Sequence, residues 1–128
     1  MAYFTFKDYV DGGRNVIDDW LSGFRDEVRG HYFDDVAYLA NTRIADWQLP
    51  KVYLLRGEFR DLIEFRVTEE RIKYRVLGFH GLGRGQVTLC GGFTHSESEA
   101  AQLQEKRRAL RRKGRIERGE AGIVDHVI

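Results

Sequence analysis

A chain of 128 residues, 42% of them hydrophobic and 32% charged, with a net charge of only +1, has the length and composition of one globular domain with a modest core. It lacks an apolar run of the roughly 20 residues that cross a bilayer, and its N-terminus lacks the basic and apolar segments of a secretory signal. The single cysteine, Cys90, excludes an internal disulfide and lacks the spacing of a zinc site, so we expect a cytoplasmic protein with neither a cofactor nor a structural metal.

A strand and two helices are predicted for the first third of the chain. Residues Tyr3 to Val10 alternate aromatic with small or polar side chains, which is typical of a strand. From Asn15 onward apolar residues recur at steps of three and four, which predicts a helix that ends at Gly30. A second helix is predicted from about Tyr32 to Ala45. Because its link to the first helix is short, we expect the two to form an antiparallel hairpin.

Three strands joined by short turns are predicted for the middle of the chain. Pro50 stands between the second helix and the first of these strands. The apolar alternation places them at 52–67 (interrupted by a bulge or tight loop at 57–61), 72–80 and 86–93. The Gly-rich segment 81–85 lies between two strands, so it is interpreted as a hairpin turn and not as a phosphate-binding loop. Such short connections predict an antiparallel meander.

A basic helix is predicted after the last strand. Ser96 and Glu99 have the spacing of a capping box, so the helix is expected to begin at Ser96 and to run to about residue 113. Its apolar stripe is narrow, which predicts a helix on the surface, and Gly114 is expected to fray its end. The tail from 119 to 128 gives no clear signal, which leaves disorder open. Helices on one face of a mostly antiparallel sheet would make the chain, residues 1–128, one α+β domain.

The net charge hides a basic cluster in this helix. Eight lysines and arginines between Lys106 and Arg118 stand against a single acid, Glu117. Phosphate contacts from such a cluster would bind RNA without regard to sequence, and an acidic partner protein would fit it equally well. Arg107 and Arg111 are the candidate RNA contacts from this helix.

Four polar residues on or beside the predicted strands are the candidate catalytic groups: Glu64, Arg66, Arg75 and His95. Glu64 and Arg66 are two residues apart in a strand, so they share a face, and the apolar row between and around them takes the core face. Both are therefore expected on the open face, within reach of a substrate. Arg75 alternates with Lys73, and these two also share a face. His95 follows the last strand, where a loop side chain can reach over the edge of the sheet.

These residue types suit the cleavage of RNA without a metal. The enzyme must remove the proton of the 2′-hydroxyl, stabilise charge on the phosphate and protonate the leaving 5′-oxygen. Arginines can clamp a phosphate, and a carboxylate or an imidazole can transfer protons. The alternatives are a structural ion pair for Glu64 and the arginines, and a solvated side chain beside a helix N-terminus for His95. Surface cations that could contact RNA or simply be solvated are Arg56, Arg60, Lys73 and Arg84.

Several short motifs follow one another in a recognisable order: Leu55 with Gly57, Glu64-Phe65-Arg66, Tyr74-Arg75, and Gly92-Phe93 followed by Thr94-His95. Their order and spacing resemble the RelE/ParE toxin superfamily, and within it the branch of HigB and phage-derived toxin-like proteins. That branch often carries two lysines after the Gly-Phe strand end, where this chain has Thr94 and His95. Other toxins of the superfamily place a catalytic histidine near this point.

The resemblance implies a RelE-like fold and the toxin of a type II toxin–antitoxin system, an endoribonuclease that cleaves mRNA on the translating ribosome. It implies that Arg66 and Arg75 hold the scissile phosphate, that His95 is the acid or base and that Glu64 is its counterpart. The implied partners are the ribosome, mRNA and a cognate antitoxin, for which the helix-turn-helix type is one option, with promoter DNA bound only through the antitoxin and no membrane. Two alternatives stay open: a non-enzymatic DNA gyrase inhibitor, and an inactive relative that binds RNA or protein.

Overall fold

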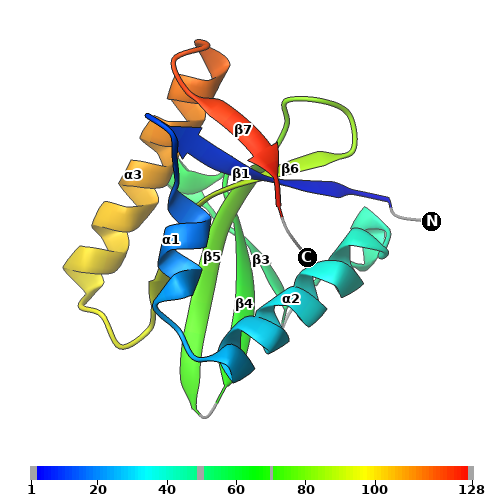
Figure 1. The fold of residues 1–128 in the computed structure, drawn as a ribbon, viewed down its shortest axis with the longest axis vertical. Coiled ribbons are helices and arrows are strands. Elements are labelled where there is room, and N and C mark those ends of the chain that lie inside the picture. The colour runs from blue at the N-terminus through cyan, green and yellow to red at the C-terminus, as the bar shows by residue number, and fades with distance from the viewer. Residues whose placement is uncertain (1–2, 49–50, 70, 127–128) are drawn as a thin grey trace.

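The computed structural model describes residues 3–48, 51–69 and 71–126, which form a mixed α+β arrangement of three helices and a seven-stranded sheet (Figure 1). Two short 3-10 turns, at Ile44–Asp46 and Gly57–Phe59, lie in the connections. Pro50 lies outside the described residues. In chain order the elements are β1 (Thr5–Asp11), β2 (Arg14–Asn15), α1 (Val16–Ser22), α2 (Asp26–Ala40), β3 (Val52–Leu54), β4 (Ile63–Glu69), β5 (Ile72–His80), β6 (Gln86–Thr94), α3 (Glu99–Glu117) and β7 (Gly122–Asp125).

The strands follow the order β2-β1-β6-β5-β4-β3, and β7 pairs with β1. The predicted meander is confirmed, because β3 to β6 pair antiparallel with their neighbours in chain order. β1 joins the sheet parallel to β6, which places the start of the chain beside its last long strand. The loop 81–85 closes the β5–β6 hairpin, as predicted. Among the described residues, no helix combines the length and the apolar character needed to cross a bilayer.

The helices cover both faces of the sheet, so the expectation that they share one face is wrong. One core cluster joins α1 and α2 to one sheet face, where Ile17 and Val36 meet Phe65. A second cluster joins α3 to the other face, where Ala109 meets Leu77. Figure 1 shows α2 and α3 on opposite sides of the central strands. The physical reason is that β5 is buried on both faces from Tyr74 to Phe79, which is a pattern of a strand covered on two sides.

The first helix ends earlier than predicted. α1 stops at Ser22 and α2 begins at Asp26, so Gly30 lies inside α2 and not at a break. Apolar residues keep the helical spacing across the link between α1 and α2, so the pattern predicted one helix where the structure has two. At its start α1 is capped by Asn15, whose side-chain oxygen accepts hydrogen bonds from the backbone amides of Ile17 and Asp18. α2 ends at Ala40, and Figure 1 shows the two helices diverging from their link.

The start of α3 also differs from the prediction. Ser98 is the N-cap, and its hydroxyl accepts a hydrogen bond from the Ala101 amide at 3.1 Å, so the proposed capping box of Ser96 and Glu99 is wrong. Ser96 instead shares a hydrogen bond with the Thr94 hydroxyl at 2.7 Å. α3 continues through residue 114 to Glu117, because helix contacts outweigh the weak propensity of one glycine.

The tail is ordered as far as it is described. β7 pairs antiparallel with β1, which corrects the expectation that left the tail open to disorder. Beyond β7, the backbone amide of His126 donates to the Phe6 carbonyl at 3.0 Å. The His126 ring is buried and lies 2.8 Å from the buried Asp8 carboxylate. The partner of the tail is therefore a residue from the opposite end of the chain.

We expect Gly92→Ala to lower the free energy of unfolding by about 1–3 kcal/mol, the usual range for overpacking. A Cβ at this position would lie 2.8 Å from the ring of Trp20, which packs on β6 from α1. Urea unfolding measures the effect. Gly30→Ala is the control, because nothing lies within 4 Å of its Cβ and it sits in α2, so this change should stabilise by up to about 1 kcal/mol. Equal stability of both variants would contradict the close approach of Trp20.

Candidate functional site

The four candidate catalytic residues come together on one face of the sheet. Arg66 of β4 and Arg75 of β5 are direct cross-strand partners, so their side chains leave the same face. Glu64 precedes Arg66 by two residues in β4 and shares that face. His95 follows β6, and its backbone amide donates to the Lys73 carbonyl at 2.9 Å, which fixes it beside the start of β5. The structure therefore brings Glu64, Arg66 and Arg75 together and places His95 beside them.

Glu64 lies beneath the arginines and not on an open surface. Glu64 is 4% exposed, so the expectation that it lies on an open face is wrong, and Arg75 is equally buried at 6% exposed. They are buried because their cross-strand neighbours are large and apolar: Glu64 faces Leu77, and Arg75 faces Phe93. This face also carries the second core cluster, which α3 covers. The sequence showed which face the residues share, but not that another part of the chain covers it.

One carboxylate oxygen serves two guanidinium groups. Glu64 Oε2 accepts a hydrogen bond from Arg66 Nε at 2.7 Å and lies 3.8 Å from Arg75 Nε. The structural ion pair that the sequence left as an alternative is therefore present. It leaves the cluster with an excess of positive charge, because two guanidiniums share one carboxylate. Such an excess attracts an anion.

Arg75 supplies charge from a buried position. Burial lowers the pKa of Arg75 and the charge of Arg66 lowers it further, while Glu64 opposes both effects. Its Nη1 donates to the Tyr74 carbonyl at 3.2 Å. Its Nε is buried and has no hydrogen-bond partner among the described residues. The Arg75 guanidinium is thus incompletely satisfied within the protein, at a point directly across from the more exposed Arg66.

Arg66 is the guanidinium that solvent can reach. Its side chain is 28% exposed and lies over the ring of Tyr53, with 4.7 Å between the guanidinium carbon and the ring centroid. Tyr53 stands opposite Glu64 across the β3–β4 ladder. Tyr53 was not among the residues predicted from the sequence, because its place in the site depends on the register between β3 and β4. The alternation of the short strand β3 gave no means to fix that register.

His95 is exposed, and its pKa is lowered. Desolvation by the surrounding protein lowers the pKa first, then the charges of Arg75 and Lys73, while the charge of Glu64 raises it. A lowered pKa keeps the imidazole neutral at neutral pH, where it can accept a proton. The location beside two arginines and a lysine is therefore suited to a base and unsuited to an imidazolium acid.

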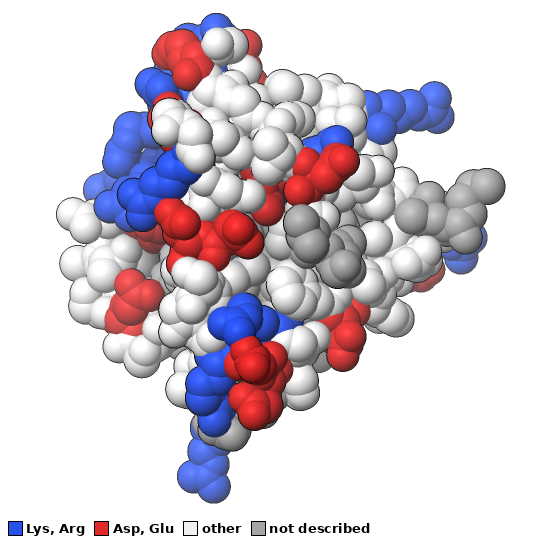
Figure 2. All heavy atoms as spheres, viewed as in Figure 1, with Lys and Arg blue, Asp and Glu red and all other residues white. Residues whose placement is uncertain are grey.

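The basic helix contributes less free charge than its sequence suggests. Among the described residues, five acids pair with its cations, and four of them lie outside the run from Lys106 to Arg118, including Asp11 in β1 and Glu58 in the second 3-10 turn. Figure 2 shows acidic side chains among the basic ones. Arg107 lies 3.8 Å from Glu58, while Arg111 is exposed and has no ion-pair partner among the described residues. The ion pairs are Arg107–Glu58, Arg108–Glu105, Arg112–Glu105, Lys113–Glu117, Arg115–Asp11 and Arg118–Glu120.

Lys106 is the cation of α3 that faces the site. Its Nζ lies 5.8 Å from the centroid of the Phe93 ring and 6.0 Å from that of Phe59. Phe93 is the cross-strand partner of Arg75, so Lys106 borders the buried end of the cluster. The sequence placed Lys106 only in a general basic cluster. Helical periodicity alone could not show which sheet residue it would meet.

The remaining candidate RNA contacts are dispersed. Arg56 and Arg60 are exposed on either side of the 3-10 turn that follows β3, and Arg60 Nη1 donates to the Gly57 carbonyl at 3.3 Å. Lys73 is exposed at the start of β5, beside His95. Arg84 is exposed in the loop at the far end of β5, about 17 Å along the strand from Arg75 at about 3.3 Å per residue. Arg84 therefore does not belong to the cluster.

Neither a search for metal sites nor comparison with known proteins assigns a function to this site. Within the described ranges, no group of three or more His, Cys, Asp or Glu side chains is arranged to hold a metal ion. Comparison with models of known protein families, with curated proteins and with solved structures found no match to this chain. The function must therefore be argued from the cluster of Glu64, Arg66, Arg75 and His95 itself.

Proposed function

We propose that this protein is the toxin of a type II toxin–antitoxin pair and that it cleaves mRNA by attack of the substrate's own 2′-hydroxyl. The observation that carries the proposal is the pairing of Arg66 with Arg75 over one shared carboxylate, with His95 beside them. The order of strand, two helices, antiparallel strands and basic helix is compatible with a RelE-like fold, which supports the same proposal. A cytoplasmic location, an antitoxin partner and action on the ribosome are parts of it.

Each residue takes a role that fits its burial. Arg66, partly exposed and held over Tyr53, binds the scissile phosphate. Arg75 adds positive potential from below, where low solvent exposure strengthens it. Glu64 fixes both guanidiniums, which makes it a positioning residue in this proposal and no longer the counterpart base. His95, neutral at pH 7, accepts the 2′-hydroxyl proton, and the leaving 5′-oxygen takes its proton from solvent.

The test is mRNA cleavage in a translation reaction with purified protein. His95→Ala is expected to lower the cleavage rate by about 10²-fold, the lower end for loss of a general base. Arg66→Ala is expected to lower it as well, whereas Arg84→Ala, which removes the same charge from the far end of β5, should leave the rate unchanged. Intact transcripts with the parent protein, or equal rates for parent and His95→Ala, would overturn the assignment.

The rate should depend on pH through the imidazole of His95. Because the pKa of His95 is lowered and its neutral form is the base, the rate should be constant at neutral pH and fall only below the ordinary histidine range. Lys73→Gln removes a charge that lowers this pKa, so it should move the acid limb toward higher pH. The pH profile of cleavage and an NMR titration of His95, each recorded for the parent and for Lys73→Gln, measure the pKa of His95 in the two proteins. A limb that does not move with Lys73→Gln would contradict the role of His95.

A non-enzymatic toxin or inactive relative is the second candidate. The observation in its favour is the short Glu64–Arg66 ion pair, which already neutralises the accessible guanidinium. A DNA supercoiling assay separates the two candidates. Inhibition of gyrase with untouched mRNA would favour the gyrase inhibitor, and RNA binding without cleavage or growth arrest would favour the inactive relative.

A further inference from the structure

The outer edge of β6 is only half covered by a neighbouring strand. β1 pairs with β6 from Gln86 to Leu89. Farther along the same edge it pairs with β2 at Val10 and Asp11, while β7 pairs with its opposite edge. Beyond that point, from Cys90 to Thr94, β6 has a strand neighbour on one side alone, among the residues that the structure describes. An uncovered edge presents unpaired backbone groups to any extended chain.

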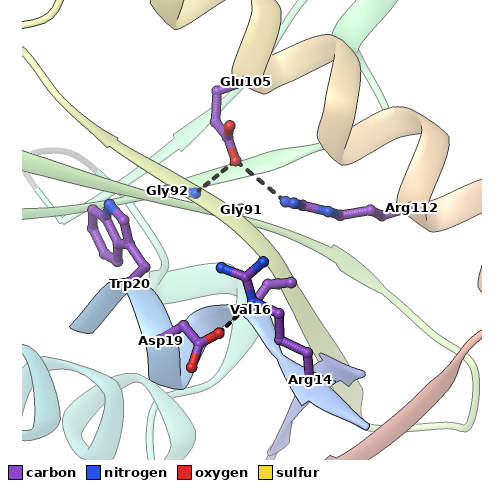
Figure 3. Close-up of a pocket in the computed structure, with 8 residues that line it drawn as sticks. All are labelled: Arg14, Val16, Asp19, Trp20, Gly91, Gly92, Glu105 and Arg112. Atoms are coloured by element: carbon purple, nitrogen blue, oxygen red, sulfur yellow. Dashed lines mark hydrogen bonds and ion pairs between the residues drawn. The ribbon is translucent and has the colours of Figure 1, made fainter. Parts of the chain in front are cut away.

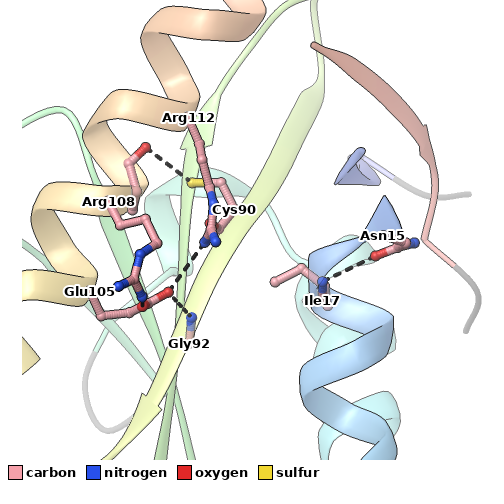
Figure 4. A network of polar contacts seen from close by, with 8 residues as sticks. Asn15, Ile17, Cys90, Gly92, Glu105, Arg108 and Arg112 are labelled. Atoms are coloured by element: carbon pink, nitrogen blue, oxygen red, sulfur yellow. Dashed lines mark hydrogen bonds and ion pairs between the residues drawn. The ribbon is translucent and has the colours of Figure 1, made fainter. Parts of the chain in front are cut away.

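At every second residue along this edge, a side chain forms a hydrogen bond with a backbone group of β6. Arg112 Nη1 donates to the Cys90 carbonyl at 2.8 Å, and the Gly92 amide donates to Glu105 Oε1 at 3.4 Å (Figure 4). The Thr94 amide donates to Glu97 Oε2 at 2.7 Å. A spacing of two residues is the spacing at which an antiparallel strand exchanges hydrogen bonds with its neighbour. The three side chains therefore make the contacts that an added strand would make.

A hollow of about 250 Å³ lies along the same edge. Trp20 of α1 and the paired Arg14 and Asp19 border it on one side, and Glu105 and Arg112 of α3 on the other. Figure 3 shows these side chains facing one another across the backbone of Gly91 and Gly92. At about 30 Å³ for each water molecule, the space holds about eight, so a short piece of extended chain can enter by displacing solvent.

We propose that the edge of β6 from Cys90 to Thr94 binds an extended segment of a partner protein as an added strand. Glu105, Arg112 and Glu97 occupy its hydrogen-bonding groups when the partner is absent. Strand addition of this kind draws affinity from main-chain hydrogen bonds and specificity from the side chains that flank the added strand. This inference is independent of the ribonuclease proposal.

The two walls specify the chemistry of the segment. On the α3 side Arg112 lines the hollow and Arg108 pairs with Glu105 beside it, so two cations stand against one acid and favour an acidic side chain. The α1 wall presents the ring of Trp20, which favours an apolar one. Because successive side chains of a strand point to opposite faces, the segment alternates apolar and acidic residues.

Arg112 and Glu105 stay paired with each other when they leave the backbone of β6, because Arg112 Nη1 lies 3.3 Å from Glu105 Oε1. What is lost is the hydrogen bonds to Cys90 and Gly92 and the bond from Thr94 to Glu97, and the added strand replaces these backbone contacts. A second copy of this protein fits less well than a peptide, because α1 and α3 flank the edge and a copy would bring its own helices against them.

The test uses ¹⁵N-labelled full-length protein and a synthetic peptide, Thr-Val-Glu-Val-Glu-Val-Thr, blocked at both ends. We expect the peptide to shift the amide resonances of Gly92 and Thr94 and the emission of Trp20, at concentrations up to about 1 mM. The matched control replaces two alternate residues of the peptide with proline, which removes ladder donors and should abolish binding. Glu105→Ala/Glu97→Ala, which removes the two acidic caps and keeps Arg108 and Arg112, should bind the parent peptide more tightly.

Three results would overturn the proposal. The first is the absence of any shift at Gly92 and Thr94 with parent protein at about 1 mM peptide, a measurement that does not depend on whether the double variant folds. The second is equal binding of the proline-containing peptide, since backbone pairing would then play no part. The third is a concentration-dependent dimer joined through β6, which light scattering would detect and which would make the occupant a second copy.

Discussion

Replacing Glu64 with alanine is expected to lower the free energy of unfolding by about 3–5 kcal/mol, the range for removing one partner of a buried ion pair. Glu64 is 4% exposed, and among the described residues its carboxylate alone forms an ion pair with both Arg66 and Arg75. Without it, the buried Arg75 keeps its charge opposite Arg66, a like charge that already lowers the pKa of Arg75. The loss therefore includes repulsion as well as a missing partner.

Urea unfolding of parent and variant gives this difference directly, provided that the slope of the transition stays the same. Glu58→Ala is the matched control, because it removes an acid from an exposed pair, 3.8 Å from Arg107. Exposed pairs of this kind contribute about 1 kcal/mol or less. A Glu64→Ala protein as stable as Glu58→Ala would mean that Glu64 does not hold the two guanidiniums together, and the positioning role would fail with it.

The strands and the shared face of the candidate site could be predicted from the sequence. Alternation in β4 places Glu64 and Arg66 together, and the short turns between β4, β5 and β6 bring Arg75 to the same side. These features depend on neighbours along the chain or across one hairpin. Local patterns are therefore enough to specify them.

The burial of the site could not be predicted, because it depends on contacts between distant segments. Leu77 and Ala109 belong to one core cluster only because α3 folds back over the sheet. A narrow apolar stripe on α3 suggested a surface helix, yet its small residue Ala109 is fully buried. The cations of α3 likewise find acids such as Glu58 and Asp11 that lie far away in sequence.

The tail illustrates the same limit most clearly. β7 has only four residues, too few to show an alternating pattern, and it is a strand because β1 offers it an edge. Its anchor, His126, finds Asp8 across 118 residues of sequence. Neither residue carries a local signal of this pairing, since each alone is an ordinary polar side chain.

Asp8→Ala is accordingly expected to destabilise the protein and to free β7. The Asp8 carboxylate lies 2.8 Å from His126 Nδ1 and accepts from Asn15 Nδ2 at 3.0 Å, so its removal leaves two groups without a partner. The other ring nitrogen of His126 is buried and has no partner among the described residues, so Asp8 is the hydrogen-bond partner that the ring depends on. Each buried polar group left unsatisfied costs about 1–3 kcal/mol.

Hydrogen exchange distinguishes local release of the tail from global loss of stability. In Asp8→Ala the amides of β7 should exchange faster than those of β5, because the β1–β7 ladder opens before the central sheet does. Asp125→Ala is the control. It removes an acid that lies in β7 itself and forms an exposed ion pair with Lys7, so the amides of β7 should stay protected from exchange. Equal protection of β7 in Asp8→Ala and parent would show that backbone pairing alone holds the strand, and that the buried Asp8–His126 contact does not anchor it.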